Sequence, residues 1–337
     1  MTQAERRQAF APGRVNLIGD HTDYAAGKAL PIALRLGTTA TFHPNASGDL
    51  VVRSSDAERP ELLIGAGSHA PGSTGAMIEG LVRSLGPVSG LLELRTTLPL
   101  GAGLSSSASM LVAAALALGV EGGTLEVAEL CQGAEAYAGQ AVGLMDQLAI
   151  LEGRDHCALL LDFASAPTWV STPVDHSASF LIVHSGVRRS LATGGYGERR
   201  AECDAASQII GPLGLASIED VAAISNPMHV RRATHVITET ERVDVFARRL
   251  RSGSLKEAGA LMVESHRSLS ELFEVSTPAV DALVEHLVSL PGVFGARMTG
   301  GGFGGCVVAL MEHGAVEPSQ FAQAWAVEPS QGASLEP

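Results

Sequence analysis

The turn that follows an apolar run near the N-terminus is the densest group of reactive side chains in the sequence. It is Asp20-His-Thr-Asp-Tyr24, which supplies two carboxylates, an imidazole, a hydroxyl and a phenol. Short polar groups fixed on one turn can bind the several hydroxyl groups of a sugar, and Asp20, His21 and Asp23 are our candidates for that role. A solvated turn without a ligand is the alternative that this segment alone leaves open.

A glycine- and serine-rich loop lies between a predicted strand at residues 90–97 and a predicted helix at residues 110–120. Glycines allow a backbone to approach phosphate oxygens, and a helix N-terminus adds free N–H groups and a positive dipole end. The loop lacks the Gly-Lys-Ser/Thr ending of the usual P-loop, so a tight turn is the alternative, but three adjacent serines favour a phosphate site. The candidate phosphate ligands are Gly101, Ala102, Gly103, Leu104, Ser105, Ser106 and Ser107.

A second glycine-rich run, residues 300–305, contains five glycines and Phe303 next to a predicted strand. So many glycines cost conformational entropy on folding. A close approach by ligand phosphates or by a neighbouring loop would explain that cost, and a structural turn is the alternative.

Asp146 is a carboxylate in apolar surroundings, since Leu144, Met145 and Leu148 are its near neighbours in sequence. Buried carboxylates are uncommon unless they are paired. We interpret Asp146 as a general base with a cationic partner, and the alternative is a capping or structural aspartate. Arg14 is the natural partner, because a guanidinium is always charged and can contact a carboxylate and a phosphate together.

The overall composition excludes several classes of protein. The chain has 337 residues, 46% of them hydrophobic, and a formal net charge of −13, which argues against a general nucleic-acid or anionic-membrane surface. The longest apolar run, residues 108–120, is too short to span a bilayer, and the N-terminus has no apolar signal core. The four cysteines form no Cys-x-x-Cys pair, so we expect reduced thiols and a cytoplasmic protein.

The hydrophobic pattern predicts a mixed α and β chain in two parts. Predicted strands cover residues 9–18, 30–42, 50–53, 90–97, 157–162, 180–185, 294–298 and 306–311. Predicted helices cover residues 76–85, 110–120, 125–137, 197–209, 230–251, 254–272 and 278–289, with Thr124 expected to cap the third. Residues 65–75 are expected to form a loop, and the Ser-, Thr- and Pro-rich residues 164–176 to contain a domain boundary. The expected domains are residues 1–170 and 171–337.

With these motifs in hand, the chain resembles the galactokinase branch of the galacto-, homoserine-, mevalonate- and phosphomevalonate-kinase (GHMP) superfamily. The first segment resembles the motif that separates galactokinases from their relatives, and the other two resemble motifs shared across the superfamily. Further likeness in residues 187–192, Tyr196, residues 264–269 and residues 329–333 extends the resemblance over residues 10–335. It implies a two-domain α+β fold, with an N-terminal α/β domain, a C-terminal ferredoxin-like α+β domain and the active site between them.

The resemblance also implies roles for individual residues. Asp146 would act at the anomeric hydroxyl of the sugar, and Arg14 would steady the transferred phosphoryl group. The loop at residues 101–107 would bind the phosphates of ATP, and Ser107 with Glu135 would ligate Mg²⁺. The implied sugar ligands are Asp20, His21, Thr22, Asp23, Gly143 and Tyr196.

The implied activity is ATP-dependent phosphorylation of galactose to galactose 1-phosphate and ADP. Two alternatives remain open, namely a related sugar-1-kinase for N-acetylgalactosamine or arabinose and a non-catalytic sugar sensor. We expect a monomer that binds a small sugar and ATP, and neither nucleic acid nor a membrane. Asp20 stands where this family usually has glutamate, so its side chain reaches one methylene less far toward the sugar.

Overall fold

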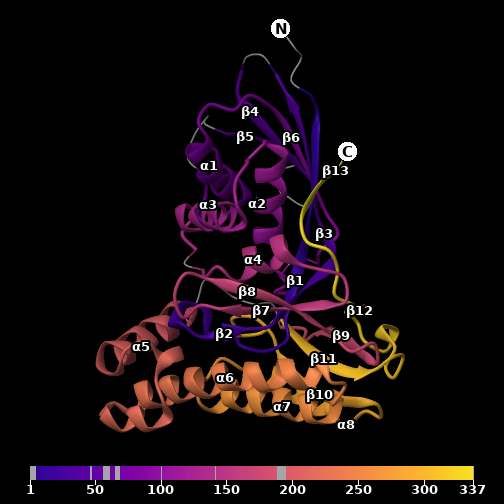
Figure 1. Cartoon of the computed structure of the whole chain (residues 1–337). Helices are drawn as coiled ribbons and strands as arrows, with labels where there is room; N and C mark the ends of the chain where they lie inside the picture. Colours follow the sequence, from indigo (N-terminus) through magenta and orange to yellow (C-terminus); the bar gives the residue numbers. More distant parts are fainter. Residues whose placement is uncertain are drawn as a thin grey trace.

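The computed structural model describes residues 5–45, 48–55, 61–64, 69–99, 101–140, 142–187 and 195–336. Within these residues the strands form sheets of six, four and three strands. Figure 1 shows the six-stranded sheet and its helices at one end of the molecule and the four-stranded sheet and its helices at the other. The segments predicted at residues 65–68 and 188–192 lie outside the described residues.

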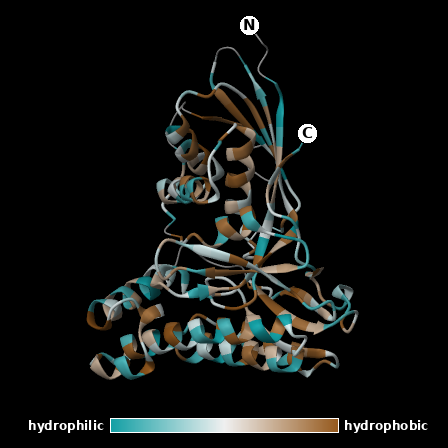
Figure 2. Cartoon of the chain, viewed as in Figure 1, coloured by the Kyte–Doolittle hydropathy of each residue, from teal (hydrophilic) through white to brown (hydrophobic). Residues whose placement is uncertain are grey.

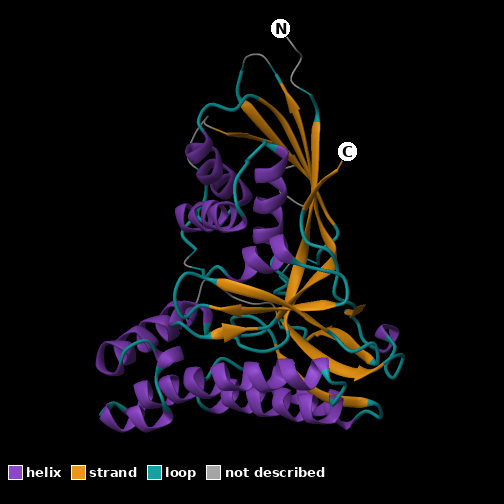
Figure 3. Ribbon diagram, viewed as in Figure 1, coloured by secondary structure: helices purple, strands orange, loops and turns teal. Residues whose placement is uncertain are grey.

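The six-stranded sheet has the order β13-β1-β3-β6-β4-β5. Its neighbouring strands pair antiparallel except β4 and β6, which are parallel. The strands are β1 (Arg7–Asn16), β3 (Pro31–Pro44), β4 (Leu50–Ser54), β5 (Glu61–Ile64), β6 (Gly90–Thr96) and β13 (Ser334–Glu336). Helices α1 (Thr74–Leu85), α2 (Ser106–Ala117) and α3 (Thr124–Tyr137) lie together beside this sheet (Figure 3).

Helix α2 is buried around most of its circumference. Eight of its twelve residues are buried, and all but Ser109 of these are apolar. Small alanine side chains let α2 approach both the sheet and α3, and Figure 2 shows it mostly in hydrophobic colours. A helix that is apolar on every side must lie inside the fold, and this burial fixes the position of the loop that precedes α2.

A small sheet and a short helix connect the two ends of the molecule. The sheet has the order β2-β7-β8, formed by β2 (Lys28–Ala29), β7 (Cys157–Asp162) and β8 (Thr168–Pro173). Helix α4 (Met145–Glu152) buries Leu148, Ala149 and Ile150 against its neighbours and leaves Asp146 in its first turn.

The C-terminal part is a four-stranded antiparallel sheet packed on helices. Its order is β10-β11-β9-β12, formed by β9 (Ala178–His184), β10 (Val293–Met298), β11 (Cys306–Glu312) and β12 (Ala324–Val327). The helices are α5 (Gly195–Ile210), α6 (Pro227–Arg251), α7 (Leu255–Glu271) and α8 (Pro278–Ser289). Short 3₁₀ helices are η1 (Asp23–Ala25), η3 (Leu213–Leu215), η4 (Ile218–Ala223) and η5 (Pro318–Gln320). Figure 1 shows α6, α7 and α8 side by side below the sheet.

One apolar cluster joins the two parts. It packs Val15 and Ile32 of the first sheet with Phe180 and Val308 of the C-terminal sheet and Phe246 of α6. The arrangement is the expected α+β organisation, with the C-terminal strand β13 returning to pair with β1. The expected domain boundary between residues 170 and 171 falls inside β8 and stays a prediction.

Several local expectations need correction. Thr124 is the first residue of α3 and not its cap, because Gly123 is the capping residue and donates its N–H to Glu126. Helix α2 begins at Ser106 and not at Met110. The segment at residues 164–176, expected only to contain a domain boundary, contains strand β8. All four cysteines are free, as expected. No helix of the described part is long and apolar enough to span a membrane.

Candidate active site

A cavity of about 420 Å³ lies where the three motif segments meet. Its wall combines the turn after β1, the loop before α2, the first turn of α4, the start of α5 and the glycine-rich run after β10. The expected site residues that line it are Arg14, Asp20, His21, Asp23, Gly101, Gly103, Leu104, Ser105, Ser106, Ser107, Glu135, Gly143, Asp146 and Tyr196. Residues from both parts of the chain therefore form one site.

Arg14 and Asp146 form a two-pronged ion pair in this wall. Arg14 Nε donates to Asp146 Oδ1 at 2.7 Å, and Nη2 donates to Oδ2 at 2.8 Å. The remaining Nη1 donates to the carbonyl of Gly103 at 2.8 Å, in the loop before α2. Asp146 also lies in the first turn of α4, where the helix dipole favours a negative charge. The guanidinium therefore joins the carboxylate to the glycine loop.

Ser105 adds a third hydrogen bond to the same carboxylate. Its hydroxyl donates to Asp146 Oδ2 in a short contact. The Ser105 backbone is left-handed, with φ 60° and ψ 45°, a conformation that costs energy for a residue other than glycine. Gly101 and Gly103 have φ of 74° and 76°. These turns direct the Ser105 hydroxyl toward Asp146 and leave the N-terminus of α2 facing the cavity.

The turn after β1 places His21 among aromatic rings. His21 Nδ1 lies 2.9 Å from the hydroxyl of Tyr24. The imidazole centroid is 4.5 Å from the Phe273 ring and 5.3 Å from the Tyr196 ring. With φ of 64°, the backbone of His21 is left-handed as well. The ring packing fixes the imidazole at the cavity wall.

Asp23 and Gly143 are in close contact across the cavity. A Cβ atom added to Gly143 would lie 1.7 Å from Asp23 Oδ2, so no larger residue fits there. Burial and the nearby charge of Asp146 raise the pKa of Asp23 to about 6. The Asp23 carboxyl group therefore holds its proton to a higher pH than an exposed aspartate does.

Asp20 is nearly buried, with an exposed fraction of 2%. Its Oδ1 accepts from the Gly300 N–H at 3.0 Å, and its Oδ2 lies 2.7 Å from Arg297 Nη1. The sequence interpretation did not single out Arg297, although a charged residue in the apolar strand before the glycine run was a usable signal. The turn after β1 is thus fastened to that run by charge and by a hydrogen bond.

Glu135, Ser107 and Gln147 form a buried polar group beside the cavity. Gln147 Nε2 donates to Glu135 Oε2 at 2.6 Å, and the Ser107 side chain is also hydrogen-bonded to Glu135. Burial and the charge of Asp146 raise the pKa of Glu135 to about 7. A carboxylate and a hydroxyl are oxygen donors of the kind that Mg²⁺ prefers. Among the described residues, no three His, Cys, Asp or Glu side chains cluster as a metal site.

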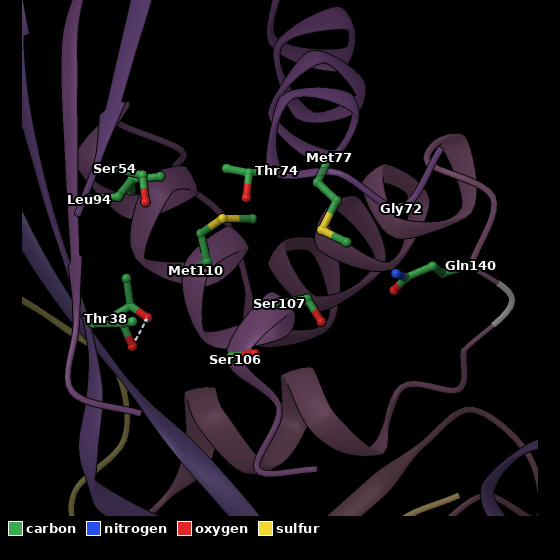
Figure 4. Close-up of a pocket in the computed structure, with 11 residues that line it drawn as sticks. Thr38, Ser54, Gly72, Thr74, Met77, Leu94, Ser106, Ser107, Met110 and Gln140 are labelled. Carbon is green, nitrogen blue, oxygen red and sulfur yellow. Dashed lines mark hydrogen bonds between the residues drawn. The ribbon is translucent and has the colours of Figure 1, made fainter. Parts of the chain in front are cut away.

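A second cavity, of about 290 Å³, adjoins the first and shares Ser106, Ser107 and Gln140 with it. Figure 4 shows Met77 and Met110 pointing into it between the sheet and the helices. The rest of its wall is formed by Thr38, Ser54, Gly72, Thr74, Leu94 and Thr96. None of these residues was expected from the sequence, because their types are common and only the packing of α1 and α2 on the sheet brings them together.

Two expected residues do not line the main cavity. Thr22 is buried, and its hydroxyl donates to the carbonyls of Gly19 and Lys28, so it stabilises the turn from beneath. Ala102 is buried in the apolar cluster that joins the two parts of the chain. Neither side chain faces the cavity, and ligand binding at these two positions, which for Ala102 would be through the backbone, stays a prediction.

Three family models match the chain. A galactokinase galactose-binding signature matches residues 2–44. A model of the GHMP kinases N terminal domain matches residues 74–154, and one of the GHMP kinases C terminal region matches residues 246–324. These matches confirm the two-domain GHMP kinase fold.

Similar full-length proteins support the same assignment. Homo sapiens galactokinase is 40% identical over 344 residues, covering 92% of this chain and 88% of that protein. Galactokinase of Mycobacterium tuberculosis (strain ATCC 25618 / H37Rv) is 40% identical over 325 residues, covering 89% of this chain and 88% of that protein. The solved structure of Lactococcus lactis galactokinase complexed with galactose superimposes with a TM-score of 0.89 at 27% identity, covering 98% and 95% of the two chains. The Methanococcus jannaschii mevalonate kinase, at 19% identity and a TM-score of 0.69, shares the fold.

The signature, the two domain models and the 40% identity over nine-tenths of the chain confirm the resemblance drawn from the three motifs. The chain belongs to the galactokinase family of ATP-dependent GHMP sugar kinases.

Proposed function

We propose that the protein transfers the γ-phosphoryl group of ATP to the anomeric hydroxyl of galactose. The observation that carries the proposal is the Arg14–Asp146 pair, which lies between the polar turn after β1 and the glycine loop before α2. A sugar on the turn and phosphates on the loop would meet at this pair.

Phosphoryl transfer depends mainly on positioning and on neutralising charge, because the transition state is loose. Asp146 would accept the proton of the anomeric hydroxyl or orient that hydroxyl toward the phosphorus. Arg14 already compensates the charge of Asp146 and would approach the transferred phosphoryl oxygens with the same guanidinium. Three hydrogen bonds from Arg14 and Ser105 leave Asp146 with one preferred orientation.

The sugar would bind over the turn after β1. Asp23 would supply a carboxylate, and His21 and Tyr196 an imidazole and a phenol. Gly143, which has no side chain, would let the sugar approach the backbone closely. A small number of fixed polar groups in a partly apolar pocket is the usual basis of small-ligand specificity.

ATP would extend over both cavities. The N–H groups at the start of α2 and the two glycines at 101 and 103 suit the phosphates. The second cavity, with Met77 and Met110, suits the flat base, since methionine adapts its shape to such a ligand.

Mg²⁺ is the metal that the donor set fits. Ser107 and Glu135 would ligate it, with Gln147 positioning Glu135 through its amide. When bound, the ion would neutralise charge on the phosphates. The raised pKa of Glu135 describes the protein without a cation, and a cation at this position would favour the ionised carboxylate.

A coupled assay of the purified protein with galactose, ATP and Mg²⁺, with anomeric phosphate as the product detected, tests the proposal. A panel with N-acetylgalactosamine and arabinose distinguishes a related sugar-1-kinase. A protein that binds galactose but gives no product would be a sugar sensor, and that result would contradict the proposal.

We extend the proposal to the domains, the oligomeric state and the location. The free cysteines suit a reducing compartment such as the cytoplasm. A monomer is the proposed oligomeric state, and residues 1–170 and 171–337 are the proposed domains. Light scattering of the purified chain and cell fractionation are the tests of state and location.

A further inference from the structure

Asp20 has both carboxylate oxygens engaged by protein. Oδ1 accepts from Gly300 N at 3.0 Å, and Oδ2 lies 2.7 Å from Arg297 Nη1. At 2% exposure, the side chain contributes to the cavity wall but offers little surface to a ligand. Glutamate, which the family usually has here, carries its carboxylate one methylene further along. In this chain the carboxylate is drawn back toward the C-terminal sheet.

Arg297 lies on β10 and is fully buried. Its Nη2 is 3.6 Å from Glu239 Oε1, so the guanidinium lies between two carboxylates. Of its two carboxylate contacts, the one to Asp20 at 2.7 Å is the shorter, so the ion pair with Asp20 holds the guanidinium. A buried cation without a carboxylate partner would be very costly. Arg297 and Asp20 therefore depend on each other.

Glu239 extends the cluster to the same turn from the other side. Its Oε1 accepts from the Gly19 N–H at 2.9 Å and from the Ser265 hydroxyl at 2.6 Å. Arg242 pairs with its other oxygen. Arg297 and Arg242 thus compensate the charges of Asp20 and Glu239. The cluster fixes Gly19 and Asp20, which immediately precede His21.

We propose that Arg297 is a positioning residue for the sugar. Its ion pair with Asp20, here called the strut, fixes the turn after β1 and so sets the positions of His21 and Asp23 in the cavity. Asp20 then does not ligate the sugar directly, which replaces the role expected from its sequence. The inference rests on the proposed function and identifies a specificity determinant of that site. The direct contacts with the sugar fall to residues after Asp20 on the turn.

The test compares Arg297→Met, Asp20→Asn and the double variant with wild type. Each single change breaks the strut, and the double variant removes both charges, so it restores the charge balance that folding needs. We expect each single variant to raise the KM and the calorimetric Kd for galactose by about tenfold, equal to about 1.4 kcal/mol. The KM for ATP and the kcat should stay within about twofold. In the double variant the KM should equal that of the singles, as coupling through one contact requires.

Arg242→Met is the matched control. It removes the other guanidinium from Glu239 without touching Asp20. Its KM for galactose should equal that of wild type, even if its melting temperature falls. A thermal melt of every variant separates loss of folding from loss of positioning, and the double variant keeps the test valid if Arg297→Met alone does not fold.

Three results would overturn the inference. An unchanged galactose KM and Kd in Arg297→Met and in the double variant would make Arg297 a purely structural residue. Asp20 would be a direct ligand if Asp20→Asn lost more galactose affinity than Arg297→Met and the two losses added in the double variant. An equal loss of galactose affinity in Arg242→Met would show that the effect on sugar binding comes through Glu239 and not through Asp20.

Failure of the proposed function is a separate result. Wild-type turnover of galactose with an unaltered KM in the variants counts against the strut alone. A wild-type protein that binds galactose without turnover counts against the kinase alone, and the Kd comparison still tests the strut. A wild-type protein that neither binds nor phosphorylates galactose would overturn both.

Discussion

Arg14 of β1 and Asp146 of α4, 132 residues apart in sequence, meet in two hydrogen bonds of 2.7 and 2.8 Å. The pair joins the strand before the polar turn to the helix that follows Gly143. Because the guanidinium also donates to Gly103, one side chain links three segments of the site. The Arg14–Gly103 contact does not involve Asp146, so a change at Asp146 that keeps its shape should alter the chemistry and leave most of the sugar-binding wall in place.

Asp146→Asn tests this separation. Asparagine keeps the shape of the side chain but cannot accept the hydroxyl proton, and general-base catalysis contributes about 10²–10⁴-fold. We expect kcat to fall by that factor while galactose still binds in calorimetry. A kcat within about tenfold of wild type would remove the general-base role.

Two substitutions at Ser105 separate the contribution of its hydroxyl from that of its left-handed backbone. Ser105→Gly keeps the left-handed backbone and loses the hydroxyl, whereas Ser105→Ala loses the hydroxyl and keeps the strain. If the hydroxyl orients Asp146, both variants should lose kcat by about tenfold, the value of one hydrogen bond of about 1.4 kcal/mol. Steady-state kinetics at saturating substrates measure this, and a glycine variant with wild-type kcat would show that only the backbone matters.

Gly143→Ala should weaken sugar binding. The added methyl group would meet Asp23 Oδ2 at 1.7 Å, so Asp23 must move. We expect the KM for galactose to rise by about tenfold or more, which corresponds to about 1.4 kcal/mol. Gly133→Ala, in α3 with nothing within 4 Å of the added atom, is the control and should keep the wild-type KM. Equal effects in the two variants would mean that the Gly143–Asp23 contact does not serve the sugar.

The parts of the site that could be predicted from sequence are those in which residue type alone constrains the chemistry. Glycine runs before a helix, an acid among apolar neighbours and a polar turn after a strand each implied a ligand group, and Arg14, Asp23 and Asp146 do line one cavity. Gln147 was missed because its role depends on Glu135, a partner that only tertiary packing supplies. The charge of Arg297 in an apolar strand was a signal, but packing alone identifies Asp20 as its partner.

The same distinction applies to the fold. Long periodic helices such as α6 and α7 were predicted close to their observed bounds, since their apolar faces repeat over many turns. Helix α4 and strands β12 and β13 were missed because each is short. Strand β13 exists only by pairing with β1, more than 300 residues earlier in the sequence, and no local pattern of three residues indicates that.

The pH dependence of sugar binding offers a test of Asp23. Burial and the charge of Asp146 raise its pKa from 3.8 to about 6, so Asp23 is ionised above that pH and neutral below it. The ionised carboxylate is the stronger hydrogen-bond acceptor. Galactose affinity should therefore be highest above pH 6 and should fall as the pH drops through 6.

The opposite sign is expected for stability. Because the folded pKa lies above the unfolded one, ionisation of Asp23 opposes folding, and this penalty grows as the pH rises from about 4 to about 6 and persists above it. Asp23→Asn should thus raise the free energy of unfolding at pH 8, by about 1–3 kcal/mol, while it weakens galactose binding. Calorimetric titrations and denaturant unfolding from pH 5 to 8 measure both effects. Because burial also raises the pKa of Glu135, to about 7, the difference between the wild-type and Asp23→Asn profiles is needed to isolate Asp23. If galactose affinity changed at pH 6 in the same way in wild type and in Asp23→Asn, the change would belong to another group.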